Sequence, residues 1–257
     1  MKYLLSIVLL LVVGSGCATA GAAANLFAPK SQGGHYQGRG QWQRSPAPGY
    51  VFEGERYELG VLIGSTDGWG SEAVDYFYDS EFRSGRLFGV SGTFVFQEWQ
   101  GGMGFAYGAR YGIELRITDY SLGLNESGFD FGDLDVTSVV CSFRFLQEPN
   151  PGSVVGFHVD LGLGIASTHF TKSSELENEE IATATTYTID TTSTLPLVFG
   201  VGLDFHIDPE VCLSLEYRYE ILQVPVDWSE NGVLRPDIDW FNADNHQFMV
   251  GIRFLFW

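Results

Sequence analysis

The chain has 257 residues, which allows one large domain or two small ones. Its net charge of −18 argues against nucleic-acid binding, which requires a basic surface. Aromatic residues make up 15% of the chain and charged residues only 18%, with 32 glycines, a composition typical of strands joined by turns.

The first residues have the features of an export signal. An apolar run follows Lys2, and small residues follow the run. The run is too short to cross a bilayer as a helix. We therefore predict a signal peptide at 1–24, cleaved after Ala20 or Ala24. Cys17 leaves a lipid-attached N-terminus as the alternative.

Residues 25–54 are rich in Gly, Gln, Ser and Pro, and no acidic residue occurs before Glu53. This composition predicts a flexible periplasmic leader. The folded domain is then expected at 55–257.

Eight stretches of the remaining chain alternate strictly between apolar residues and residues that are small or charged. Such a period of two predicts strands with one apolar face. Pro196 lacks an N–H, so we expect a bulge or a free edge at that residue. The stretches are 57–64, 87–96, 105–117, 138–145, 154–165, 195–205, 213–221 and 248–256.

The connections between these stretches alternate in length, which predicts an eight-stranded antiparallel up-and-down barrel. Short turns are expected at one rim and long loops at the other. Ten strands are the alternative, if 73–82 and part of 183–192 also pair in the membrane; we interpret both as strand extensions above it. The four long connections are 66–86, 119–135, 167–187 and 223–245.

The apolar face is expected to meet lipid and the other face to fill the barrel. The second face is crowded with Gly, Ala and Ser, which suits a packed interior better than a water-exposed surface. Outward tyrosines such as Tyr57 and Tyr217 suit the boundary between lipid and water. Cys141 and Cys212 fall on opposite faces of non-neighbouring strands, which argues against a disulfide.

In its signal segment, its eight alternating strands and its last strand, the sequence resembles the small outer-membrane β-barrels of the OmpA/OmpX type. The resemblance covers 55–257 and implies a Gram-negative outer membrane, with both termini in the periplasm. It also implies that the last strand is recognised by the barrel assembly machinery, with Trp257 one residue beyond the usual final Phe. The residues of this assembly signal are Val250, Ile252, Phe254, Phe256 and Trp257.

The inward face carries six acids and five arginines, a near balance that favours paired charges over an ion-selective pore. We expect these residues to plug the barrel and hold it rigid, with a narrow or gated channel as the alternative. They are Glu58, Arg110, Glu114, Arg116, Arg144, Asp160, Asp204, Glu216, Arg218, Glu220 and Arg253.

Catalytic and cofactor chemistry have weak support in the sequence. His158 and Asp160 could face Asp204 and His206 across two strands and ligate a transition metal, but a hydrogen-bonded set is the favoured interpretation. A lipid-modifying enzyme needs a nucleophile beside a base, and only His169, two residues after a serine, offers one. We predict no catalytic residues, no metal and no cofactor.

The long connections are acidic and aromatic and hold most of the net negative charge. Aromatic anchors with charged neighbours suit a partner surface. We therefore expect a monomer with a structural or surface-interaction role, and the resemblance adds adhesion as a role. The expected partners are outer-membrane lipid and lipopolysaccharide, the assembly machinery and an extracellular ligand.

Overall fold

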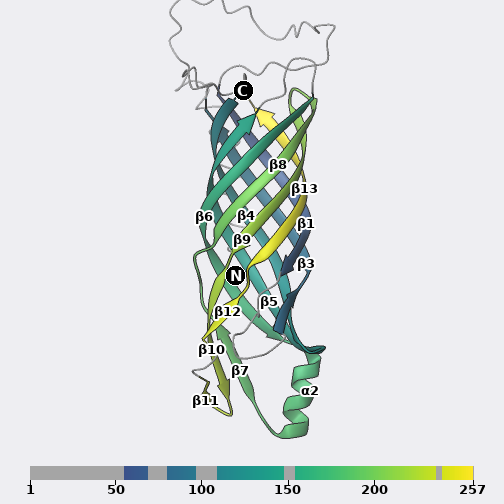
Figure 1. Ribbon diagram of the computed structural model, residues 1–257, viewed down its shortest axis with the longest axis vertical. Coiled ribbons are helices and arrows are strands. Elements are labelled where there is room, and N and C mark those ends of the chain that lie inside the picture. The colour runs from purple at the N-terminus through teal and green to yellow at the C-terminus, as the bar shows by residue number, and fades with distance from the viewer. Residues whose placement is uncertain (1–54, 69–79, 97–108, 148–153, 236–238, 257) are drawn as a thin grey trace, which may run out of the picture. The chain divides into compact units, whose positions relative to one another are not determined.

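Eight long strands close into an antiparallel barrel (Figure 1). The closing pair is β1 (Arg56–Gly68) with β13 (Asn245–Phe256), so the first and last of the eight are neighbours. The predicted eight-stranded all-β barrel is confirmed. This computed structural model describes residues 55–68, 80–96, 109–147, 154–235 and 239–256. The predicted signal peptide and leader, including Ala20 and Ala24, lie outside these residues and stay predictions.

Around the barrel, each long strand pairs with the next long strand in the chain. The order after β1 is β3 (Gly85–Val95), β4 (Ala109–Glu126), β5 (Phe129–Gln147), β6 (Val155–Lys172), β8 (Leu197–Asp208), β9 (Val211–Ile221) and β13. The shorter elements are β2 (Ser80–Arg83), α2 (Ser174–Thr183), β7 (Tyr187–Thr191), β10 (Gln223–Glu230), β11 (Val233–Leu234) and β12 (Trp240–Asn242).

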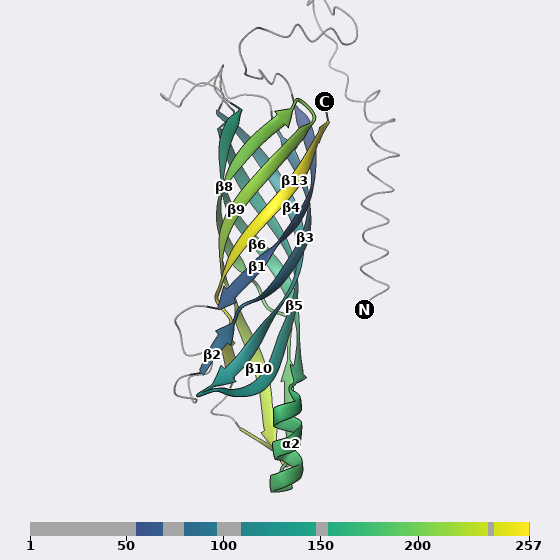
Figure 2. The same cartoon turned by 90° about the vertical axis from the view of Figure 1, so that its right-hand side faces the viewer.

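The barrel has two unlike ends. At the terminal end, where β1 begins and β13 finishes, Pro209 and Glu210 form the predicted short turn between β8 and β9. The other two predicted short turns fall in 97–108 and 148–153, outside the described residues. At the extended end, α2, β7, β10 and β11 lie beyond the barrel proper (Figures 1 and 2).

A belt of exposed apolar side chains surrounds the part of the barrel nearer the terminal end. The strands alternate because each second side chain points outward. Aromatic rings gather at both limits of the belt, as in barrels that cross a bilayer. Tyr57, Phe94 and Phe96 are in ring contact at one limit, and Tyr217 and Phe248 at the other. The outward residues include Leu59, Val61, Ile63, Phe88, Ile113, Leu115, Val139, Phe143, Phe157, Val159, Leu161, Leu163, Phe199, Val201, Leu203, Leu215, Val250, Ile252, Phe254 and Phe256.

Beyond the belt, the strands invert their pattern. In β4 the inward positions change from Glu114 and Arg116 to Leu122 and Leu124, all of them buried. Outward positions there become polar, as at Asp119. A solvated outer surface reverses the arrangement that lipid requires, so the apolar residues turn inward. The extended end therefore has a hydrophobic core of its own, which includes Leu134, Val136, Phe170, Leu176, Ile189, Leu222, Val224, Val226, Trp228 and Phe241.

The prediction of a long loop at 119–135 is wrong. β4 and β5 continue through it and are joined by Ser127 and Gly128, whose φ values are 48° and 90°. Positive φ at both central residues is the geometry of a tight hairpin turn. Asn231 and Gly232 join β10 to β11 in the same way, with φ of 52° and 77°. Much of the expected loop at 223–245 is thus also strand.

The described parts of the two segments considered as further membrane strands, β2 and β7, lie beyond the belt. β2 pairs with the outer part of β4, and β7 pairs with β10. Pro196 lies just before β8, where the regular ladder with β6 ends; beyond it only the bridge between Ala166 and Thr194 continues the pairing. β7 then leaves the barrel wall.

The helix α2 lies within 167–187, which was predicted to be a long connection without regular structure. The Ser173 hydroxyl caps it by accepting from the Leu176 N–H at 3.0 Å, and Glu175 and Glu177 favour its N-terminus. Ala184 ends the helix in the left-handed conformation. In the described part of the chain, no helix is long and apolar enough to span a membrane.

Candidate functional site

All eleven charged residues assigned to the inward face are buried inside the barrel. The sequence analysis missed Arg56, whose side chain is also buried and lies 2.7 Å from Glu58. Continuing the alternation of β1 back by one residue would have found it. With Arg56, the buried charges of the described residues are six carboxylates and six guanidiniums, an exact match of the two signs.

Glu114 lies at the centre of this network and contacts three arginines. Its oxygens are 2.9 Å from Arg116 Nε, 2.8 Å from Arg144 Nη2 and 2.6 Å from Arg218 Nη2. These residues come from three strands, β4, β5 and β9. Charge-assisted bonds of this kind compensate the cost of removing each ion from water.

Toward the terminal end, Arg253 joins two further carboxylates. It lies 3.2 Å from Glu58 and donates a short hydrogen bond to Asp204. Arg110 donates from Nε to the Phe96 carbonyl at 3.2 Å.

Toward the extended end, Glu220 is held by neutral groups. Tyr120 donates its hydroxyl at 2.8 Å, and Gln247 donates a short hydrogen bond. The hydrophobic core of the extended end lies next along the barrel interior, since Tyr120 is followed on the inward face of β4 by Leu122 and Leu124. The barrel interior thus holds a network of charged side chains, followed along the barrel by a core of apolar side chains.

Glycines make room for this charged filling. A Cβ at Gly202 would lie 2.3 Å from the His158 ring, and one at Gly60 would lie 2.6 Å from the Ser91 hydroxyl. The preference for small residues on the inward face, visible in the sequence, is thus a packing requirement.

The structure brings together two of the four residues considered for a metal, His158 and Asp160, in a group that could share an ion. His158 Nδ1 lies 2.9 Å from Asp204, and His158 Nε2 lies 3.9 Å from Asp160. His206 is buried but does not belong to this group. Glu216, which the sequence analysis placed only in the charge network, takes its place.

The residues considered for lipid chemistry do not form a catalytic arrangement. Ser167 and His169 lie on β6 at the edge of the belt, and no hydrogen bond joins their side chains. Asp135 is the cross-strand neighbour of His169, but its carboxylate accepts from Thr171. His246 lies on the outward face of β13, with Nδ1 2.5 Å from the Tyr217 hydroxyl.

The surface of the extended end is acidic. On α2, Glu180 pairs with Lys172 at 2.7 Å; that bond and the Tyr187 N–H lower the pKa of Glu180 below its ordinary value. On β5, partial burial and then the carboxylates of Asp130 and Asp135 raise the pKa of Asp133.

The two free cysteines, as expected, share no disulfide: Cys141 is exposed and Cys212 is buried. Of the predicted assembly signal, Val250, Ile252, Phe254 and Phe256 all point outward, and Trp257 lies outside the described residues.

Known proteins of similar structure include several outer-membrane barrels. Neisserial surface protein A is 13% identical over 79% of this chain and 99% of its own, with a TM-score of 0.43. Ail, the attachment invasion locus protein of Yersinia pestis, is 18% identical over 80% of this chain and 100% of its own, with a TM-score of 0.41. The outer-membrane enzyme PagL is 12% identical over 76% and 97%, with a TM-score of 0.36.

No protein-family model matches the sequence. No curated protein matches it either. Assignment of the chain therefore rests on its own architecture. Only a closed barrel satisfies every backbone hydrogen bond of strands in lipid. A closed barrel with a lipid-facing belt, aromatic limits and a filled polar interior is the form that outer-membrane proteins take. The chain is therefore a small, eight-stranded transmembrane β-barrel, the architecture of outer-membrane proteins.

Proposed function

We propose that the protein acts without catalysis, as a rigid outer-membrane support that presents an acidic surface to partners outside the cell. The observation that carries this proposal is the extended end, where the strands continue beyond the lipid belt around a hydrophobic core. A core of this kind fixes the shape of the projecting surface.

The filled interior supports a structural role over conduction. Most charged residues of the belt region are paired with an opposite charge, Glu220 is held by neutral donors, and the interior beyond them is apolar. An ion would have to cross both the charged network and the hydrophobic core of the extended end, and an unpaired charge is costly in that core. This arrangement favours a plugged barrel that holds its shape.

The proposed topology puts both termini in the periplasm and the extended end outside. The short Pro209–Glu210 turn then faces the periplasm, the usual position of short turns in such barrels. The proposed ligand is a cationic surface, because the exposed carboxylates of α2 and β5 outnumber nearby cations. We further propose that the chain is a monomer assembled by the barrel machinery through Val250–Phe256.

Lipid contacts on the belt follow from the same orientation. A groove of about 560 Å³ is lined by Ile63, Phe88 and Val250, with both Arg86 and Asp119 at its polar margin. An acyl chain fits the apolar wall, and a phosphate of a phospholipid or lipopolysaccharide suits the guanidinium. This groove supports lipid and lipopolysaccharide as partners.

The orientation can be tested by labelling single cysteines on intact cells with a membrane-impermeant maleimide. Cys141 and Cys212 are first replaced by alanine. Ser127→Cys, in the β4–β5 turn, should react on intact cells. Glu210→Cys, in the β8–β9 turn, is the matched control and should react only after the outer membrane is permeabilised. The opposite result would reverse the topology and refute a surface role for the extended end.

A further inference from the structure

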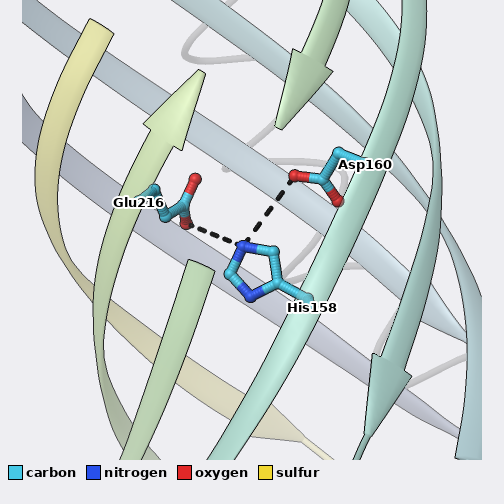
Figure 3. A group of neighbouring side chains, drawn as sticks. All are labelled: His158, Asp160 and Glu216. Carbon is cyan, nitrogen blue, oxygen red and sulfur yellow. Dashed lines mark ion pairs between the residues drawn. The ribbon is translucent and has the colours of Figure 1, made fainter. Parts of the chain in front are cut away.

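Inside the barrel, the carboxylates of Asp160 and Glu216 both lie near one imidazole nitrogen of His158 (Figure 3). His158 Nε2 lies 3.8 Å from Glu216 Oε1 and 3.9 Å from Asp160 Oδ2. Both His158 Nε2 and Glu216 Oε1 are buried without a hydrogen-bond partner. Other buried atoms of the described interior, such as Arg144 Nη1, also lack a hydrogen-bond partner, but these two face each other, and buried polar atoms are usually satisfied.

The tautomer of His158 follows from its other nitrogen. Nδ1 lies 2.9 Å from Asp204 Oδ2, and a carboxylate only accepts, so Nδ1 carries the proton. Arg253 Nη2, which can only donate, lies farther from Nδ1, at 3.3 Å, so the closer contact with Asp204 decides where the proton lies. The other ring nitrogen, Nε2, faces the carboxylates of Asp160 and Glu216. Distances of 3.8 and 3.9 Å are too long for direct hydrogen bonds but leave space for an ion between the three atoms.

We propose that His158, Asp160 and Glu216 bind a first-row transition-metal ion of the Zn²⁺ class inside the barrel. One imidazole nitrogen with carboxylate oxygens is a ligand set that such ions accept. Hard ions such as Mg²⁺ and Ca²⁺, which prefer an all-oxygen shell, are disfavoured by the imidazole.

The groups around the three ligands orient them as they are oriented in known metal sites. Asp204 accepts from the ring nitrogen that is not a ligand, the arrangement that fixes a metal-binding histidine. Arg116 holds Glu216 through Oε2 at 2.6 Å, which leaves Oε1 for the ion. Arg144 holds Asp160 through both oxygens, at 2.7 and 2.9 Å, and Arg218 also donates to Oδ2 at 2.8 Å, so an ion would share that oxygen with two guanidiniums.

The neighbouring strand also leaves room for the imidazole. Gly202 is the cross-strand partner of His158, and a Cβ there would overlap the ring. Gly200 stands opposite Asp160 in the same way, with a Cβ position 3.3 Å from the Asp160 side chain. The two glycines of β8 therefore accommodate two of the three ligands.

The surrounding arginines limit the affinity and the route of entry. Arg253 Nη2 lies 3.6 Å from Glu216 Oε1 and competes with a cation for that oxygen. Because all three ligands are buried, an ion enters most readily while the barrel is closing. Loading during folding is the condition under which the site must be tested.

The test refolds residues 25–257 into detergent with Zn²⁺ or Co²⁺ present, removes free metal on a desalting column and measures bound metal by mass spectrometry. The wild-type barrel should retain about one ion per chain. When the ion is Co²⁺, its absorption spectrum should be that of an ion with a low coordination number. His158→Gln and Glu216→Gln should each lower retention about tenfold or more. Circular dichroism and resistance to unfolding in SDS show which variants have folded.

His206→Gln is the matched control, since His206 is a second buried imidazole of the same barrel outside the group. It should retain metal as the wild type does. A folded wild-type barrel without bound metal would overturn the proposal and leave a buried water as the occupant. Equal retention by folded His158→Gln would overturn it as well. Neither result bears on the surface role, which the labelling of Ser127→Cys and Glu210→Cys tests separately.

Discussion

Arg144 and Asp160 face each other across β5 and β6 and form a two-pronged ion pair. Arg144 donates from Nε to Oδ1 at 2.7 Å and from Nη2 to Oδ2 at 2.9 Å. Cross-strand register places the two residues directly opposite each other. Both side chains are buried, so the pair is isolated from the screening that weakens surface ion pairs.

Breaking this pair should destabilise the barrel strongly. Asp160→Asn leaves the Arg144 guanidinium partly uncompensated, and removal of one partner of a buried pair costs about 3–5 kcal/mol. The measurement is urea unfolding of the refolded barrel in lipid vesicles. A combined Arg144→Gln and Asp160→Asn variant should lose less than the two single losses together, because the two sites are coupled. Strictly additive losses would show that the pair contributes nothing as a pair.

Glycine at 202 should be needed for packing and not only for turn or strand geometry. Gly202→Ala puts a methyl group against the His158 ring, and such overpacking costs about 1–3 kcal/mol. Gly92→Ala is the control, since its Cβ would meet only Leu59 Cδ2, at an ordinary 3.8 Å. The measurement compares the unfolding midpoints of the two variants, and Gly202→Ala should have the lower one. Equal stability would mean that His158 moves aside without loss.

The refolded barrel should carry no steady current across a planar bilayer. Paired charges fill the belt region and an apolar core fills the extended end, so no continuous polar path is expected. Glu114→Gln should also be silent if it folds, because the apolar filling remains. Steady conductance that changes in Glu114→Gln or Arg218→Gln would place those charges along a path and make the protein a channel.

Acid should loosen α2 from β6. The pKa of Glu180 is lowered by its hydrogen bonds with Lys172 and the Tyr187 N–H, so this contact stabilises the fold at pH above the ordinary value of 4.5. The contribution is lost as the pH falls through the lowered pKa of the folded state. An NMR titration should show the pKa of Glu180 rising toward 4.5 in Lys172→Met.

Arg235→Met serves as the control for that titration. Arg235 pairs with Glu230 on the β10–β11 hairpin, so its removal should leave the pKa of Glu180 where it is. An unchanged pKa in Lys172→Met would show that the Lys172–Glu180 pair does not persist in solution.

The sequence by itself determined the faces of the barrel strands. A period of two is local information: lipid accepts only apolar side chains outside, and a narrow interior accepts only small or compensated ones. Glu58, Glu114 and Arg253 could be assigned to the interior for that reason. The same reasoning would have found Leu122 and Leu124, had the alternation been followed after its apolar face turned inward.

Only the tertiary structure decided which residues meet. Register and strand tilt depend on closure of the whole barrel, so the contacts of Glu114 with Arg218 and of His158 with Glu216 cannot be derived from spacing along one strand. The helix at Ser174–Thr183 was likewise hidden, because its surface is polar nearly all round. The alternation of side chains along a strand is set by the lipid on one face and the barrel interior on the other. The contacts between side chains are set by strands that are distant in the chain.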